Sequence, residues 1–79
     1  MQVGEKVRGI VIKSLGIGED KYDEDLTIGD IPEWDSIGHV NLLQAIESQF
    51  EISFDVGDAI EAESVGDLID LVNKYTAIN

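Results

Sequence analysis

The spacing of apolar residues constrains the fold of this chain more than any other feature of its sequence. Along residues 2–15 apolar side chains follow one another at intervals of four, three, one and four positions, which places them on one face of a helix: Val3, Val7, Ile10, Val11 and Leu15. Gly16 and Gly18 then interrupt the pattern. A first helix is therefore predicted over residues 2–15.

The following segment, IGEDKYDEDLTIGDIPEW, has no sustained period and contains Gly29 and Pro32. We expect a long loop, which in a compact domain is usually functional or anchored to the core. The expected anchors are its large apolar residues: Leu26, Ile28, Ile31 and Trp34.

A second helix is predicted to begin at Asp35 or Ser36, because both residue types are good N-caps and Pro32 lies just before them. Leu42, Ile46 and Phe50 repeat every four residues and extend this helix to about residue 51. A short helical turn is expected over residues 57–61. A last helix to about residue 75 is expected after Ser64 and Asp67, which resemble a capping box.

These elements predict an all-α fold, a bundle of three main helices and one short helix with no candidate strand. At 79 residues the chain is expected to form a single small domain, residues 1–79, with a thin core. The chain has no cysteine, so neither a disulfide nor a cysteine ligand or nucleophile is available. Its charged, amphipathic start argues against a signal peptide or membrane span, which makes the cytoplasm the expected location.

The charge of the chain restricts its partners. Seventeen acidic residues against five basic ones give a net charge of −12. Nucleic acids and anionic membranes would be repelled, so the expected partners are proteins with basic patches. A hydrophobic content of 43% is too high for a disordered acidic tail, so a folded acidic module is expected.

The segment PEWDSIGHVNLL combines an acid, a hydroxyl and the single histidine of the chain. A minimal serine hydrolase is one hypothesis, because Ser36 and His39 are three residues apart on one side of a helix. However, Asp35 is poorly placed to orient His39, and the G-x-S-x-G elbow is absent. A second hypothesis is an unmodified acidic interaction module in which Asp35 and Ser36 only cap the helix.

The third hypothesis is covalent attachment. Helix N-termini present free N–H groups and a positive dipole end, which favour a phosphate, and Ser36 offers a hydroxyl at that point. Glycine within a helix costs about 1 kcal/mol relative to alanine. Gly38 therefore suggests that a bare backbone near Ser36 leaves room for another molecule.

The stretch WDSIGHVNLLQAIESQF resembles the D-S-L segment and second helix of acyl and peptidyl carrier proteins, which are four-helix domains. The resemblance extends over nearly the whole chain, ending in a last helix entered through ESVGDLIDLV. It implies that Ser36 carries 4′-phosphopantetheine derived from coenzyme A. Asp35 and Ile37 would then contribute to recognition by the transferase and by partner enzymes.

What the resemblance implies is a monomeric, non-catalytic carrier of thioesters with no resident metal. Its partners would be a phosphopantetheinyl transferase and the enzymes that load and process acyl or aminoacyl groups. The cargo could belong to fatty acid, polyketide or nonribosomal peptide biosynthesis, as an acyl, hydroxyacyl or aminoacyl group.

Two features depart from the carriers of general fatty acid synthesis. Ile37 stands where leucine is usual, and the second helix has neutral residues where those carriers have acids: Gly38, Asn41, Gln44 and Ser48. Acids are concentrated instead in the preceding loop and toward the C-terminal half. The stretch W-D-S-I-G-H-V-N-L is therefore more similar to discrete carriers of specialised pathways than to the carriers of general fatty acid synthesis.

Three smaller predictions concern the single histidine, the acidic run of the loop and a group of apolar residues near Ser36. His39 is expected to pack against Trp34 rather than to act in catalysis. A minor additional hypothesis is that it also lies near the prosthetic phosphate, which would favour its charged form. The acidic run EDKYDED is expected to face protein partners, because it lacks the ligand spacing of a calcium loop. Some apolar residues could line a cleft beside the arm or simply belong to the core: Ile37, Val40, Ala59 and Ile60.

Overall fold

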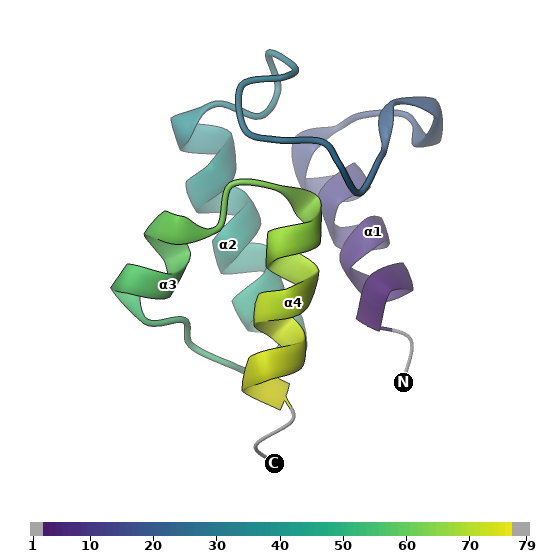
Figure 1. Ribbon diagram of the computed structural model, residues 1–79. Helices are drawn as coiled ribbons and strands as arrows, with labels where there is room; N and C mark the ends of the chain where they lie inside the picture. The colour runs from purple at the N-terminus through teal and green to yellow at the C-terminus, as the bar shows by residue number, and fades with distance from the viewer. Residues whose placement is uncertain (1–2, 77–79) are drawn as a thin grey trace.

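A computed structural model describes residues 3–76, and within that range the chain forms four α-helices (Figure 1). They are α1 (Val3–Leu15), α2 (Ser36–Phe50), α3 (Val56–Glu61) and α4 (Val65–Thr76), with a 3-10 turn, η1 (Glu19–Lys21), in the long loop. No strand occurs among these residues; a single antiparallel bridge joins Thr27 to Ser64. The predicted all-α architecture is confirmed.

The three longer helices form the body of the bundle. α1 contacts both α2 and α4, and α2 runs antiparallel to α1 (Figure 1). The loop between α1 and α2 crosses over one end of the bundle, and α3 lies to one side, next to α2 and α4. None of the described helices is long and apolar enough to cross a membrane.

The core is built from the apolar faces that the spacing predicts. α1 contributes four buried residues, and α2 and α4 face it with others: Val3, Val7, Val11, Leu15, Leu42, Ile46, Val65, Leu68, Leu71 and Val72. Burying a valine or leucine fully contributes about 1.5–3 kcal/mol. The amphipathic helices therefore hold one another in place mainly through this shared interior.

The helix ends agree with the chemistry of their residues. Gly16 ends α1 with a φ of 68°, a left-handed conformation in which its N–H donates to the Ile12 carbonyl at 3.0 Å. The predicted start at residue 2 lies outside the described residues. At α4 the Asp67 N–H donates to Ser64 Oγ at 3.0 Å, as in a capping box. The Asp67 carboxylate accepts from the Glu63 N–H instead of the Ser64 N–H.

The long loop is anchored more firmly than its sequence suggests. Leu26, Ile28 and Ile31 are half-buried against the core, as predicted. Backbone hydrogen bonds also tie the loop to the start of α4: the Ile28 N–H donates to the Glu63 carbonyl at 2.9 Å, and the Val65 N–H donates to the Leu26 carbonyl at 3.0 Å. These bonds fix the segment that delivers the chain to α2.

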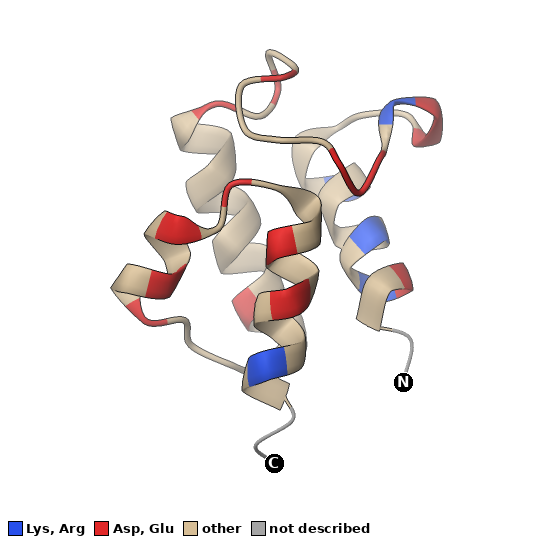
Figure 2. Cartoon of the chain, viewed as in Figure 1, with Lys and Arg blue, Asp and Glu red and all other residues tan. Residues whose placement is uncertain are grey.

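Charges are unevenly distributed over the bundle. Most basic residues lie on α1 and η1, whereas acids cover α3, α4 and the long loop (Figure 2). Between Ser36 and Ile46, α2 contains no acidic residue and no lysine or arginine. The first three turns of α2 therefore form a neutral strip within a strongly acidic molecule.

Candidate functional site

The N-terminus of α2 is capped by Asp35. This residue has extended backbone angles, and its Oδ1 accepts a hydrogen bond from the Gly38 N–H at 2.8 Å. Its carbonyl accepts from the His39 N–H, also at 2.8 Å. Ser36 is the first helical residue and is exposed, and within residues 3–76 its hydroxyl has no intramolecular hydrogen bond. The cap thus leaves a free hydroxyl at the positive end of a helix dipole.

Trp34 fixes the approach to this helix. The side chain is fully buried, which confirms its predicted role as a loop anchor. The backbone N–H of Trp34 donates to the Ile31 carbonyl, and the backbone carbonyl of Trp34 accepts from the Gly29 N–H. The indole Nε1–H donates to His39 Nδ1 at 3.0 Å, and the two rings stack with centroids 5.9 Å apart. Loop and helix are therefore joined directly beside Ser36.

The predicted contact between His39 and Trp34 is confirmed, with a hydrogen bond in addition to packing. Because Nδ1 accepts a hydrogen bond, the imidazole carries its proton on Nε2. A charged imidazole would need a proton on Nδ1 as well, so the charged form proposed for a phosphate contact does not fit this arrangement. Within the described residues, His39 has no side-chain hydrogen bond to Ser36 or Asp35, so the hydrolase geometry is not assembled.

Gly38 has a different role from the one that its sequence suggests. A Cβ atom at this position would lie 2.5 Å from the Glu33 carbonyl oxygen and 3.3 Å from Asp35 Oδ1. The space that the missing side chain leaves is therefore occupied by the chain's own backbone. The prediction that Gly38 leaves room for another molecule is wrong, because the loop turns so tightly into α2 that no side chain fits.

A groove of about 400 Å³ lies between α2, α3 and the long loop. Three of the four residues predicted to line a cleft do so: Val40, Ala59 and Ile60. The fourth, Ile37, does not line it and is instead 73% exposed on the surface. The groove is mostly apolar, and its lining includes His39, Leu43 and Phe54.

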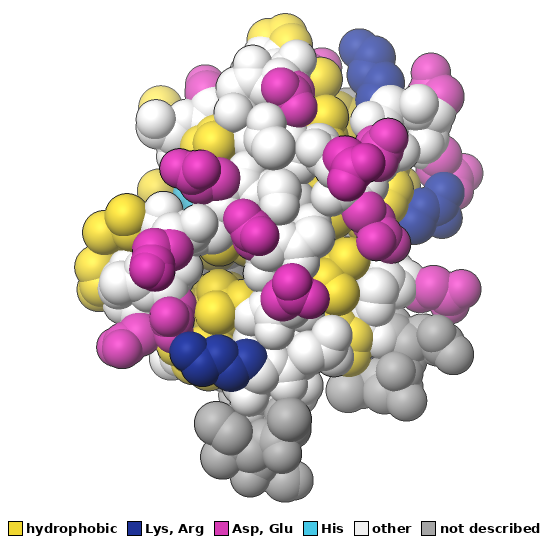
Figure 3. Space-filling model, viewed as in Figure 1, with side chains coloured by type: hydrophobic (Ala, Val, Ile, Leu, Met, Phe, Trp, Pro, Cys, Tyr) yellow, Lys and Arg dark blue, Asp and Glu magenta, His cyan; other side chains and the backbone are white. Residues whose placement is uncertain are grey.

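Exposed apolar side chains surround the mouth of this groove. Val40, Val56 and Ile60 are 52%, 74% and 72% exposed, which is unusual for large aliphatic residues. Hydrophobic side chains are visible along the outer side of α3 in Figure 3. Val40, Val56 and Ile60, together with the exposed Ile37 that follows Ser36 in α2, form the apolar surface of α2 and α3.

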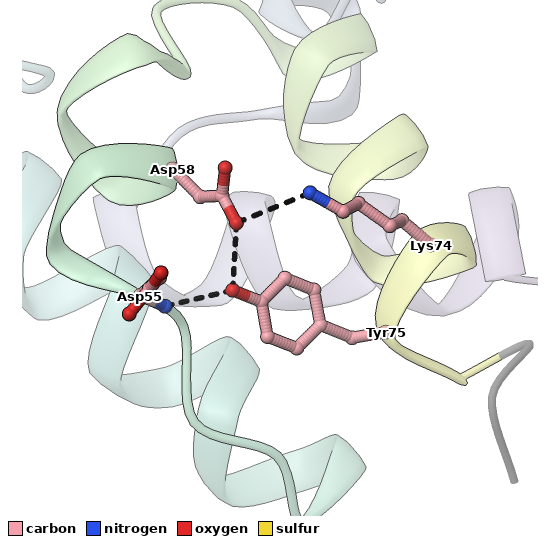
Figure 4. Close-up of polar contacts among 4 residues, drawn as sticks. All are labelled: Asp55, Asp58, Lys74 and Tyr75. Atoms are coloured by element: carbon pink, nitrogen blue, oxygen red, sulfur yellow. Dashed lines mark hydrogen bonds and ion pairs between the residues drawn. The ribbon is translucent and has the colours of Figure 1, made fainter.

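Polar contacts hold α3 in place against α2 and α4. The Phe54 N–H donates to Glu47 Oε2 at 2.7 Å, and the Asp55 N–H donates to the Tyr75 hydroxyl at 2.8 Å. The Tyr75 hydroxyl in turn donates to Asp58 Oδ2 at 2.7 Å, and Lys74 Nζ lies 3.3 Å from the same oxygen (Figure 4). The Tyr75 and Lys74 interactions lower the pKa of the Asp58 carboxyl.

The sequence contains no local signal for these contacts. Tyr75 lies 17 residues from Asp58 and 20 from Asp55, so no periodic pattern relates them. Nothing in the sequence distinguishes Glu47 from the many other acidic residues, although its carboxylate holds the turn before α3. Tyr75 and Glu47 thus position α3, which forms one wall of the groove.

The acidic run in the loop does not assemble a metal site. Within residues 3–76, no three or more histidine, aspartate or glutamate side chains are placed to hold a metal ion. Asp23 accepts instead from the Asp25 N–H at 2.9 Å, and Glu19 pairs with Arg8 at 2.8 Å.

Comparison with known proteins defines the class. A family profile described as "Phosphopantetheine attachment site" matches residues 5–72. Because this match covers most of the sequence, the chain belongs to the family of phosphopantetheine-carrying proteins. Its cofactor is accordingly 4′-phosphopantetheine, held covalently, and the chain is a carrier that is not itself an enzyme.

Two relatives narrow the class to acyl carrier proteins. The chain is 29% identical over 73 residues to an acyl carrier protein of Thermotoga maritima, covering 92% of this chain and 90% of that protein. It also superposes on the solution structure of a holo acyl carrier protein from Geobacter metallireducens with a TM-score of 0.86 and 29% identity, covering 99% of this chain and 90% of that one. The fold is that of an acyl carrier protein.

The described residues fit such a prosthetic group. A phosphodiester needs an accessible hydroxyl, and Ser36 is exposed. The phosphate would lie at a capped helix N-terminus with no acidic residue in the first turn, where the dipole favours negative charge. When bound, the group supplies a thiol, which this cysteine-free chain lacks.

Proposed function

We propose that Ser36 carries the 4′-phosphopantetheine group and that the chain presents acyl or aminoacyl thioesters to partner enzymes. The observation that carries this proposal is the free, exposed hydroxyl at the first residue of α2, inside the matched region and three residues before His39, which lines the apolar groove. The chain's own part is to hold and present; the bond to Ser36 and all later chemistry require other enzymes.

Asp35 and Ile37 would direct recognition of this serine. Asp35 holds the helix start in one conformation through its bond to the Gly38 N–H, so the hydroxyl is presented in a fixed position. Ile37 is 73% exposed one residue later and offers an apolar contact to any enzyme that approaches Ser36. A transferase would therefore meet a charged cap and an aliphatic side chain on either side of its target.

We further propose that the pathway is specialised rather than general fatty acid synthesis. The support is the neutral strip of α2, where exposed Asn41 and Gln44 offer no charge to a basic enzyme surface. Partners would be steered over a distance by the overall charge of −12 and then contact the apolar surface of Ile37, Val40, Val56 and Ile60. In this proposal residues 1–79 act as a monomeric, cytoplasmic carrier domain.

Intact-protein mass after co-expression with a broad-specificity phosphopantetheinyl transferase tests the attachment. We expect a single phosphopantetheine adduct on the natural chain and none on Ser36→Ala. Ser48→Ala is the matched control, because Ser48 is also an exposed serine on α2 and its loss should leave the adduct in place. An unmodified natural chain, or an adduct that persists in Ser36→Ala, would refute the proposal.

A further inference from the structure

The imidazole of His39 is held in one orientation and one tautomer. Trp34 is fully buried and donates its indole N–H to Nδ1 at 3.0 Å, while the two rings stack at an interplanar angle of 29°. An indole N–H is a donor only, so Nδ1 must act as the acceptor and the proton resides on Nε2. Rotating the ring away would leave the buried indole N–H without a partner, which is costly.

This arrangement leaves Nε2–H as the remaining hydrogen-bond donor of the ring, on a residue that lines the groove. His39 lines the groove together with Val40, Leu43 and Ile60, and it is the lining residue nearest to Ser36 along α2. Among the described residues, the structure records a hydrogen bond only at the Nδ1 side of the ring. Of the two other polar side chains in the lining, Glu47 already accepts a hydrogen bond from the Phe54 N–H and Glu63 is exposed. Both are carboxylates and offer acceptors.

We propose that the Nε2–H of His39 donates a hydrogen bond to a carbonyl or hydroxyl oxygen of the arm or its cargo when that group fills the groove. The inference rests on the proposed attachment at Ser36. It adds a positioning residue, because a fixed donor in a mostly apolar groove favours an occupant that brings an oxygen to the same point. Such a donor distinguishes oxygen-bearing occupants from plain alkyl chains, since a polar group left unpaired in an apolar site is penalised.

The position of Ser36 argues against the phosphate as the acceptor. Ser36 does not line the groove, whereas His39 does, and a phosphate on Ser36 is favoured at the helix N-terminus, where the backbone N–H groups and the dipole lie. The acceptor must therefore belong to a part of the arm beyond the phosphate, or to the cargo. The two sources share the same chemistry, an oxygen with a free lone pair.

The test uses the natural chain with ¹⁵N-labelled histidine and ¹³C-labelled methyl groups in four forms. These are the apo-protein, and the protein modified by a broad transferase from coenzyme A, butyryl-coenzyme A or 3-hydroxybutyryl-coenzyme A. NMR then follows the Nε2–H signal of His39 and the methyl signals of Val40, Leu43 and Ile60. Intact mass confirms loading of each sample, so a failure of attachment at Ser36 is recognised separately from a failure of this inference.

We expect the apo-protein to show a protonated Nε2 and a hydrogen-bonded, unprotonated Nδ1. On loading, the Nε2–H signal should move downfield and exchange more slowly with water, in the same sample in which the groove methyl signals shift. A change that begins with the coenzyme A sample assigns the acceptor to the arm. A change confined to both acyl forms assigns it to the thioester carbonyl, and a larger change with 3-hydroxybutyryl assigns it to the cargo hydroxyl.

Three outcomes would overturn the proposal. Methyl shifts without a change at Nε2–H would show that the groove is filled and His39 is not used. A change at Nε2–H without methyl shifts would indicate contact with the phosphate outside the groove. No change in either set of signals in fully loaded protein would show that the groove does not receive the arm.

Discussion

Gly38 shows how closely the chain approaches itself at the site. The Glu33 carbonyl oxygen occupies the position that a side chain would need. We predict that Gly38→Ala lowers the free energy of unfolding by about 1–3 kcal/mol, because the loop must move to relieve the clash. Gly57→Ala is the matched control: this glycine also lies in a helix, α3, and a Cβ there meets open space.

Urea unfolding of both glycine variants gives the comparison. Gly57→Ala should leave stability unchanged or raise it by up to about 1 kcal/mol, since alanine is the better helix former. Equal stability of Gly38→Ala and the natural chain would contradict the geometry at the start of α2.

The two tyrosines within the described residues provide a second test at the residue scale. The Tyr75 hydroxyl accepts from the Asp55 N–H and donates to Asp58, whereas the Tyr22 hydroxyl is buried with no hydrogen-bond partner in the structure. We predict that Tyr75→Phe lowers the midpoint of thermal unfolding, although the edge contact of its ring with Phe54 is kept. Tyr22→Phe should be neutral or stabilising, by up to about 1 kcal/mol.

Calorimetry or thermal circular dichroism of both phenylalanine variants measures this difference. The prediction for the network in Figure 4 fails if the two variants shift the unfolding midpoint equally.

Both tyrosines also predict sensitivity to alkali. Burial raises the pKa of Tyr22, and nearby Glu24 adds to the effect. At Tyr75 the Asp55 N–H lowers the pKa, but the hydrogen bond to Asp58 and burial outweigh it, so the pKa is raised. A raised pKa in the folded state means that stability is fully present below the ordinary value of 10.0 and is lost as pH rises through and beyond it.

Tyrosinate absorbance and urea unfolding between about pH 9 and pH 11 check this dependence. We expect folded protein to form tyrosinate at higher pH than unfolded protein, with stability falling over the same interval. Identical titration of the folded and the urea-unfolded chain would count against the burial of these hydroxyls.

At the scale of elements, α2 combines two roles. Its inner face packs Leu42 and Ile46 into the core, and its outer face presents a neutral strip and the apolar residues near Ser36. α3 adds Val56 and Ile60 to the same surface and is held there by Glu47 and Tyr75. The surface that partners would meet is therefore shaped by contacts from three helices.

We predict that restoring an acid on α2 improves loading by an enzyme of general fatty acid synthesis. Gln44→Glu should raise the loading efficiency of the holo-protein severalfold at low salt, because it adds a charge where a basic enzyme surface would dock. Asn73→Glu, on an exposed position of α4, adds the same net charge elsewhere and should have little effect.

The assay is the initial rate of acyl transfer at two salt concentrations, because a docking charge should lose its benefit as salt rises. A natural chain that is already loaded as fast as a general fatty acid carrier would contradict the specialised assignment.

At the scale of the whole molecule, the fold was largely predictable and the fine geometry of the site was not. The periodic apolar residues determine the helices, and Asp35 and Ser64 carry recognisable cap chemistry, because such signals act within a few residues. The contacts of Tyr75 with Asp58 and of Ile28 with Glu63 join residues far apart in the chain, so no local pattern encodes them. Gly38 and Glu33 are only five residues apart, but their contact depends on how tightly the loop turns into α2, which the residue types do not reveal. The sequence therefore suggested an open space at Gly38 where the backbone passes.

The central claim is that one prosthetic group is attached at Ser36 of an otherwise unreactive bundle. Fragmentation mass spectrometry of the intact modified chain, after treatment with coenzyme A and a broad transferase, tests it most directly. We predict that fragments ending before residue 36 are unmodified and that fragments including it carry the full adduct. An adduct located at any other serine, or a chain that stays unmodified while a known carrier is fully converted in the same tube, would contradict the account.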